Sequence, residues 1–267
     1  AGRRAPARTG RVVIGIGPAD DARAATLLGR TSALVKLVVV VTWLLGVFVT
    51  PDPRASLVLG LSGLLAAVSL GSVPAPVILR GLAPLAIAAC GVAFFAAVFA
   101  VGNGRPDAVA VLELGPLVIS VAGVEAGLLV GARLLAIGAI SIAYATTTSP
   151  TALVDSLVQQ AGVSDRFAYG ALAAYGALPR LAGDLRALRE ARALRGLRAD
   201  LHPRLLVALL VLAIRHAERL GVAMDARGFG QGRRSAYRPL AWGLRDLLVG
   251  VGGVAIVAVV VGPTLIA

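Results

Sequence analysis

The segment Pro179–Gly230 reads PRLAGDLRALREARALRGLRADLHPRLLVALLVLAIRHAERLGVAMDARGFG, and two similar tripeptides close two helical patterns within it. These tripeptides are Leu194-Arg195-Gly196 and Ala226-Arg227-Gly228. Arginine at a helix C-terminus complements the negative end of the helix dipole, and the glycine after it accepts the left-handed backbone that ends a helix. The two tripeptides are therefore either ordinary helix caps or matched docking points for two similar partner surfaces. The residues alone leave both interpretations open.

The first helical pattern of this segment is basic. Leu181, Leu185 and Leu188 have helical spacing, and arginines recur every three residues from Arg186 to Arg198. Because a row with that spacing drifts around an α-helix, it does not form one flat basic face. We expect most of these arginines to meet solvent or lipid phosphate.

Other helices are predicted on both sides of this pattern. After it, His202-Pro203 starts a helix whose first half, Leu205–Ile214, is apolar on all sides and is therefore expected to be buried, although it is too short to cross a bilayer. Before it, Ser149-Pro150 is a good N-cap and first-turn pair for an amphipathic helix along the inner membrane interface. Phe167–Leu181 is expected to form a second, mildly apolar helix.

Most of the remaining chain is apolar. Of its 267 residues, 58% are hydrophobic, and several apolar runs approach the roughly 20 residues needed to cross a bilayer. The composition predicts an all-α, polytopic helical membrane protein with about five transmembrane helices. The expected spans are about Ala33–Val49, Ala55–Leu70, Leu82–Val101, Val124–Tyr144 and Leu247–Ala267. Pro116 is expected to split the long run before the fourth span and to leave a membrane-edge segment there. Lys36, near the start of the first span, is expected to snorkel outward.

The distribution of arginine predicts the topology. The formal net charge is +12, and the predicted outer loops offer only Arg54 and Arg105. By the positive-inside rule, the N-terminus and the long basic segment lie in the cytoplasm and the C-terminus lies outside. We expect a cytoplasmic arm over residues 1–31, transmembrane helices 1–4 over 32–147, a cytoplasmic helical region over 148–240 and the last transmembrane helix over 241–267.

Two charged residues fall in or near the fourth span. Glu125 and Arg133 are about two helical turns apart, so they share a helix face without touching directly. A charge inside a span is costly and usually faces protein or water. The pair predicts either a polar contact with another subunit or an internal contact with neighbouring helices, and both remain open.

Several classes of function are disfavoured. Catalysis needs convergent acid, base, nucleophile or metal groups, and the sequence predicts none; Cys90, His202 and His216 stand apart and predict no metal site. The chain lacks the Gly-Lys-Ser/Thr phosphate-binding motif, so we do not expect it to hydrolyse ATP. The arginine row from Arg186 to Arg198 has no interleaved aromatic residues, which argues against nucleic acid. A stand-alone permease or channel is the alternative to a scaffold, but only Glu125 and Arg133 qualify as mid-membrane charged sites.

The order of short motifs is similar to a known family. From about Lys36 to Ile266 the chain resembles the transmembrane scaffold (T) component of energy-coupling factor transporters, the EcfT/CbiQ family. The motifs that carry the resemblance, besides the two tripeptides, are Gly123-Val124-Glu125-Ala126-Gly127-Leu128, Arg133-Leu134-Leu135, Thr147-Thr148-Ser149-Pro150 and Leu178-Pro179-Arg180.

The resemblance implies a function and partners. In that family the long cytoplasmic helices are coupling helices, and each carries an Ala-Arg-Gly-like tripeptide that docks on one of two ATP-binding cassette ATPases. Carried over, the docking arginines are Arg195 and Arg227, although Leu194 replaces the usual alanine and Arg192, in Ala191-Arg192-Ala193, competes with Arg195. The implied protein is a non-catalytic scaffold in a prokaryotic cell membrane that binds no cofactor directly. Its partner ATPases use ATP and Mg²⁺, and a substrate-binding membrane (S) subunit takes up a vitamin or a transition-metal ion.

Overall fold

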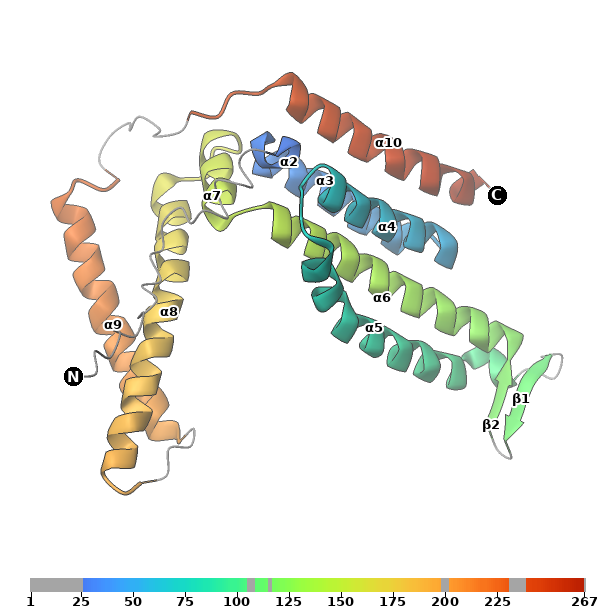
Figure 1. Ribbon diagram of the computed structural model, residues 1–267, viewed down its shortest axis with the longest axis horizontal. Coiled ribbons are helices and arrows are strands. Elements are labelled where there is room, and N and C mark those ends of the chain that lie inside the picture. Colours follow the sequence, from blue (N-terminus) through green and yellow to red (C-terminus); the bar gives the residue numbers. More distant parts are fainter. Residues whose placement is uncertain (1–25, 105–108, 115–116, 198–201, 231–238, 267) are drawn as a thin grey trace, which may run out of the picture. The chain divides into compact units, whose positions relative to one another are not determined.

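The computed structural model describes residues 26–104, 109–114, 117–197, 202–230 and 239–266 (Figure 1). The described residues form two compact units. The first unit falls within Ala1–Leu153 and Ala241–Ala267, and the second unit is Val154–Leu240. The expected arm over residues 1–31 lies almost wholly outside the described residues, which begin just before the short helix α2 (Leu27–Arg30).

Five apolar helices lie in the described part of the first unit. They are α3 (Ala33–Val49), α4 (Pro53–Ser69), α5 (Ala75–Val98), α6 (Val121–Thr147) and α10 (Leu244–Ile266). By length and composition, α5, α6 and most of α10 can cross a membrane. The shorter α3 and α4 have 17 residues each, at the lower end of the range of about 17–25 that spans a bilayer. A polytopic helical membrane protein is therefore confirmed, and the first predicted span coincides with α3.

The core of the first unit forms where helices from distant parts of the sequence meet. Helix α6 packs against α4 and α5, while α10 packs against α3 (Figure 1). Trp43 and Val47 of α3, Leu59 of α4 and Ile140 of α6 form the buried cluster, and Val261 of α10 closes it. The last span is therefore part of the same bundle as the first four.

Glycine allows the closest helix approach in this bundle. On α6, Gly123, Gly127 and Gly131 are spaced four apart and all face α5. A Cβ atom on Gly127 would lie 2.5 Å from the carbonyl oxygen of Ala93. Small residues at such spacing let helix backbones meet in lipid, where no hydrophobic effect drives the helices together.

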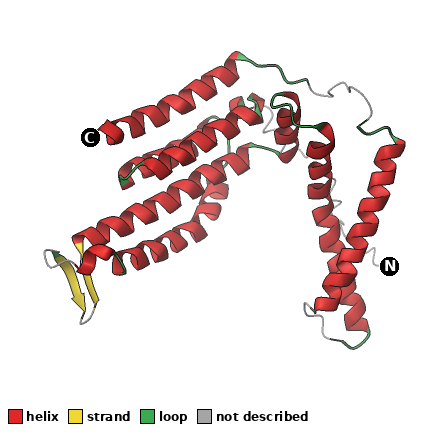
Figure 2. Cartoon of the chain, turned by 180° about the vertical axis from the view of Figure 1, so that it is seen from behind, coloured by secondary structure: helices red, strands yellow, loops and turns green. Residues whose placement is uncertain are grey.

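A β-hairpin takes the place of the predicted membrane-edge segment. Strands β1 (Ala110–Leu114) and β2 (Leu117–Ser120) pair antiparallel and are drawn in yellow in Figure 2. The Asn103 side-chain oxygen accepts hydrogen bonds from the Ser120 backbone N–H (3.0 Å) and hydroxyl (2.8 Å). These bonds hold the turn Val101–Gly104, which follows α5, against the junction between β2 and α6. Pro116, the predicted break, lies outside the described residues, and the all-α prediction holds apart from these two short strands.

Every described secondary-structure element of the second unit is a helix. Helix α7 (Pro150–Gln159) enters it, and α8 (Asp165–Leu194) packs against α9 (Pro203–Ala226). Ser149 caps α7 as predicted, since its hydroxyl accepts a hydrogen bond from the Ala152 N–H at 3.2 Å. The prediction of a separate helix over Phe167–Leu181 is wrong, because α8 continues past Leu181 to Leu194 without a break, with Pro179 inside it. A proline inside a helix removes one backbone hydrogen bond and can be absorbed as a kink.

Two burial predictions are also wrong. In the predicted buried stretch of α9 only Leu205 is buried, at 4% exposure, whereas Val207 is 63% exposed. An apolar run does not show whether its own chain or a partner covers it. Conversely, Lys36 does not snorkel: it is 6% exposed, and its Nζ donates a hydrogen bond to the Thr147 carbonyl at 3.0 Å. A polar acceptor at the end of α6 replaces water for this ammonium group.

Candidate functional site

The two Arg-Gly helix ends have nearly the same backbone. Arg195 caps α8 with φ −89° and ψ 9°, and Arg227 caps α9 with φ −91° and ψ 7°. The glycines that follow, Gly196 and Gly228, have φ of +71° and +66°. Residues that carry a Cβ atom rarely adopt this left-handed backbone conformation, so both turns require glycine. The predicted helix caps are confirmed.

The same pair of hydrogen bonds closes each helix. In both, the glycine N–H and the N–H of the residue after it return to carbonyls of the last turn, which is the Schellman arrangement. The bonds run from Gly196 to Ala193 (3.0 Å), from Leu197 to Arg192 (3.1 Å), from Gly228 to Asp225 (2.9 Å) and from Phe229 to Met224 (3.0 Å). The sequence similarity of the tripeptides thus extends to a shared three-dimensional motif.

Both ends present their arginine at the surface. Arg195 and Arg227 are exposed, and Leu194 is 90% exposed. Arg192, the competing candidate, lies inside the last turn of α8 and is half-buried. Arg195 is therefore the structural counterpart of Arg227. The docking role of both arginines stays a prediction.

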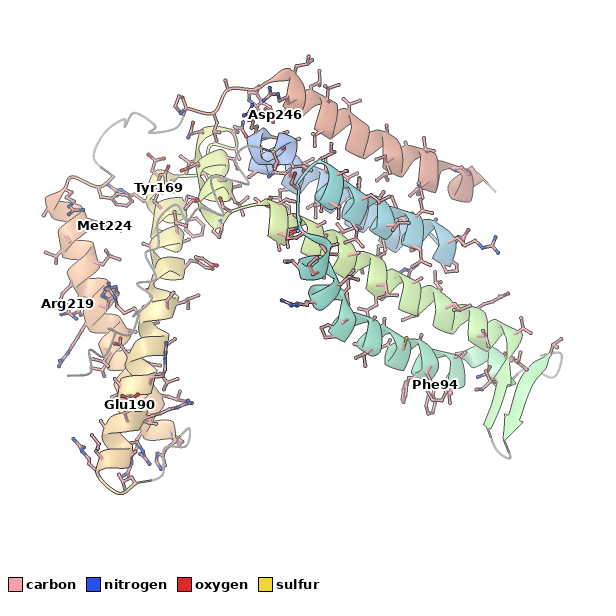
Figure 3. The ribbon with its side chains drawn as sticks, in the orientation of Figure 1. Phe94, Tyr169, Glu190, Arg219, Met224 and Asp246 are labelled. Atoms are coloured by element: carbon pink, nitrogen blue, oxygen red, sulfur yellow. The ribbon has the colours of Figure 1, made fainter. Side chains whose placement is uncertain are left out.

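The two ends are far apart within the second unit. A short connection joins α8 to α9, so the helices run antiparallel and end on opposite sides of their crossing. Glu190, near the end of α8, and Met224, near the end of α9, mark these two sides in Figure 3. The 24 residues of α9 span about 36 Å at 1.5 Å per residue.

A polar contact marks the helix crossing. The Arg180 guanidinium lies 3.0 Å from His216 of α9. Asp184 and Arg219 line the same surface hollow of about 460 Å³. From the sequence, His216 was only excluded from a metal site, and this partner was missed, because a contact between residues of two different helices has no local signal.

Further contacts fix the base of the second unit. Arg166, at the start of α8, donates a hydrogen bond to the Gly230 carbonyl at 2.9 Å, just beyond the Arg227 end. The Tyr169 hydroxyl donates to the Asp155 carboxylate at 3.0 Å. Burial, together with this hydrogen bond and the charge of Asp155, raises the pKa of Tyr169 to about 12. The neutral phenol therefore joins α7 to α8 over the whole physiological pH range.

The two charges of the fourth span have different environments. Arg133 donates a hydrogen bond to the Thr50 carbonyl at 2.8 Å, and its guanidinium lies 5.7 Å from the centre of the Phe48 ring. This internal contact ties α6 to the end of α3. Glu125 is exposed, and its contact with another subunit stays a prediction. Among the described residues, no group of three or more His, Cys, Asp or Glu side chains could hold a metal ion.

Comparison with known proteins places this architecture among transport proteins. Residues 24–237 match the family model CbiQ, described as cobalt transport protein. The energy-coupling factor transporter transmembrane protein EcfT of Heliobacterium modesticaldum is 30% identical over 247 residues, which cover 85% of this chain and 90% of that protein. The EcfT protein of Bacillus selenitireducens is 28% identical over 244 residues, which cover 84% of this chain and 88% of that protein.

A third relative differs in kind. An ABC transporter ATP-binding protein of Bifidobacterium longum is 27% identical over 180 residues, which cover 61% of this chain. The match covers only 23% of that protein. Most of that relative therefore lies outside the part that resembles this chain.

Proposed function

Because the chain belongs to the CbiQ family, whose EcfT relatives are transmembrane components of energy-coupling factor transporters, we propose that it is the scaffold that connects two partner ATPases to a substrate-binding membrane subunit. The ATPases bind ATP and Mg²⁺, and this chain is non-catalytic. The observation that carries the proposal is the duplicated, exposed Arg-Gly helix end at Arg195 and Arg227.

Each helix end has the chemistry to dock on an acidic groove. A guanidinium group offers a planar fork that binds a carboxylate with two parallel hydrogen bonds, which an ammonium group does not reproduce. The glycine at each end turns the chain away, so the arginine remains at the tip. The relative from Bifidobacterium longum supports the ATPase partner. That protein is named for ATP binding, and a segment of it is similar to this chain.

Two related ATPases would engage the two ends at once. When the ATPase pair closes, the ends of α8 and α9 move with it about the crossing at Arg180 and His216. The first half of α9 carries an exposed apolar face that can transmit this motion to the substrate-binding subunit. The residues of this face are Leu206, Val207, Leu210, Val211 and Ile214.

The cargo is a micronutrient, either a transition-metal ion or a vitamin. The family description names cobalt transport, so cobalt is the first substrate to test. In this arrangement the substrate-binding subunit selects the cargo, and the scaffold needs no metal ligands of its own. The arginine distribution supports a cytoplasmic N-terminus and cytoplasmic Arg195 and Arg227 in a prokaryotic cell membrane.

Purification from mild detergent, followed by mass spectrometry, tests the proposal. We expect two related cassette ATPases and one small membrane protein to accompany the tagged chain. The double variant Arg195→Ala/Arg227→Ala should lose the ATPases, whereas Arg186→Ala, which removes an exposed arginine from the same helix α8, should retain them. A lone monomer or homo-oligomer in several detergents would instead favour a stand-alone permease and would leave Arg195 and Arg227 as helix caps.

A further inference from the structure

The first unit contains a cavity that the proposed function does not use. Its volume is about 390 Å³, and α3, α4, α6 and α10 line it together with the end of α2. Trp43, Gly63, Ile140 and Gly252 form part of its apolar wall. The volume falls within the range of about 300–1,000 Å³ that is typical of ligand pockets.

The cavity is polar at one end only. Its two charged lining residues, among those that the structure describes, are Lys36 and Arg245, and both are basic. They belong to the first turns of α3 and α10, beside the end of α6. Thr31, Tyr144 and Thr147 line the same end, whereas the rest of the wall is apolar. The cavity is therefore complementary to an amphiphile that has an anionic head and an apolar tail.

The charges at this end have separate tasks. The Asp246 carboxylate accepts hydrogen bonds from the backbone N–H groups of Ser32 (2.7 Å) and Gly243 (3.1 Å), which holds the start of α10 against α3 (Figure 3). Lys36 is bound to the Thr147 carbonyl. Arg245 is exposed and is the cation that can reach a ligand at the cavity mouth.

We propose that the cavity binds an anionic phospholipid, with one acyl chain between the helices and the phosphate at Arg245. Guanidinium groups bind phosphate with two hydrogen bonds, and basic pockets between transmembrane helices are typical sites for anionic lipid headgroups. A partner helix is disfavoured, because one about 10–12 Å across would fill this volume with only about one turn. The lipid comes from the leaflet at this end, which the arginine distribution predicts to be the cytoplasmic one.

Trp43 provides a direct test. It is 5% exposed, it lines the cavity, and its Nε1 donates to the Gly253 carbonyl at 2.8 Å. The sequence has two tryptophans, so Trp242→Phe leaves Trp43 as the single fluorophore. The Trp242→Phe protein is placed in phosphatidylcholine bilayers, and a brominated lipid that quenches tryptophan fluorescence is added in increasing fractions. One series uses brominated phosphatidylglycerol and the other uses brominated phosphatidylcholine. We expect the quenching by brominated phosphatidylglycerol to saturate, because about 1 kcal/mol for one basic side chain near the surface favours this lipid about fivefold over the host lipid. Its half-maximum should come at a fraction of about one sixth, whereas brominated phosphatidylcholine, which only exchanges with the same host lipid, should reach half-maximum at about one half.

Two variants locate the lipid. Gly252 lines the cavity, and a Cβ atom at this position would have no neighbour within 4 Å, so Gly252→Leu fills the space and should abolish saturable quenching. Arg245→Gln should keep the quenching but remove the preference for phosphatidylglycerol. Gly91→Leu, at an equally open position on α5, is the matched control and should behave as the parent.

Three results would overturn the proposal. These are quenching that rises linearly and equally for both lipids, quenching that persists in Gly252→Leu, and no quenching at all. The first two would mean that Trp43 senses bulk lipid, and the third would mean that no acyl chain enters the cavity. If Gly252→Leu fails to fold, the lipid preference in the parent and in Arg245→Gln still decides the question.

Discussion

The first and second units differ in where they place charge. In the first unit, Lys36 and Asp246 are buried and satisfied by neighbouring helices, while the outer surface is apolar and suited to lipid. In the second unit, Ala168 is the only buried residue of α8 and Leu205 the only one of α9. Both charged and apolar side chains of these helices are exposed. The first unit is therefore organised by contacts within the chain, whereas the second leaves most side chains of α8 and α9 uncovered by its own chain, as the proposed docking requires.

If the first unit depends on contacts within the chain, the largest loss of stability is expected from a substitution at the contact between α5 and α6. Gly127→Leu would place side-chain atoms against the α5 backbone at Ala93, and we expect it to destabilise the protein by about 3 kcal/mol or more, because overpacking against backbone has little room to relax. Thermal unfolding in detergent measures the change. Gly170→Leu on α8, where no atom lies within 4 Å, is the control and should cause no loss. Equal destabilisation by both variants would contradict the comparison.

A smaller effect is expected at the buried carboxylate. Asp246→Ala would leave the N–H groups of Ser32 and Gly243 without their acceptor, and a buried unsatisfied donor costs about 1–3 kcal/mol. We expect a loss of about 2–3 kcal/mol in the free energy of unfolding. The matched change in the second unit, Glu218→Ala at an exposed position of α9, should stay within about 0.5 kcal/mol. If Asp246→Ala is as mild as Glu218→Ala, this carboxylate does not organise the first unit.

Prediction from the sequence succeeded best where the signal is local. The span Ala33–Val49 coincides with α3, and the Arg-Gly caps follow from dipole and glycine chemistry that a few adjacent residues carry. Lys36 was mispredicted because its acceptor, Thr147, is 111 residues away in the chain. A lysine near the end of an apolar run has the same local pattern whether it snorkels or is bound internally.

The other errors have related causes. The predicted helix ended at Leu181, where the apolar pattern gives way to a basic one, yet α8 runs on to Leu194 as one helix. The stretch Leu205–Ile214 is apolar on all sides, which indicates burial but does not indicate in which molecule the covering surface lies. The structure leaves most of that stretch exposed. The burial prediction therefore failed for the isolated chain, at the surface where we propose that a partner subunit binds.

A third prediction concerns the backbone of the helix ends. Gly228→Ala would force a side chain into φ of +66°, which costs about 1–2 kcal/mol for an L-residue. Because the strain is confined to the end of α9, we expect faster amide hydrogen exchange in its last turn and no change in the first unit. Gly221→Ala, inside α9 with open space around it, should instead slow exchange, since alanine favours a helix by about 0.8–1.0 kcal/mol over glycine.

The smallest effect on stability is expected at the docking arginines, where the effect on function should be large. Arg195→Lys/Arg227→Lys keeps the positive charge at each helix end, so the unfolding temperature should not change. The planar fork is lost, however, and each docking contact should weaken by about tenfold if one charge-assisted hydrogen bond of about 1.4 kcal/mol disappears. Titration of the purified ATPases against the reconstituted protein measures this loss. Full ATPase affinity in the lysine variant would mean that charge alone is recognised, whereas lower stability would mean that these arginines hold the second unit together. Only weaker docking at unchanged stability agrees with a unit whose surface is built for its partners.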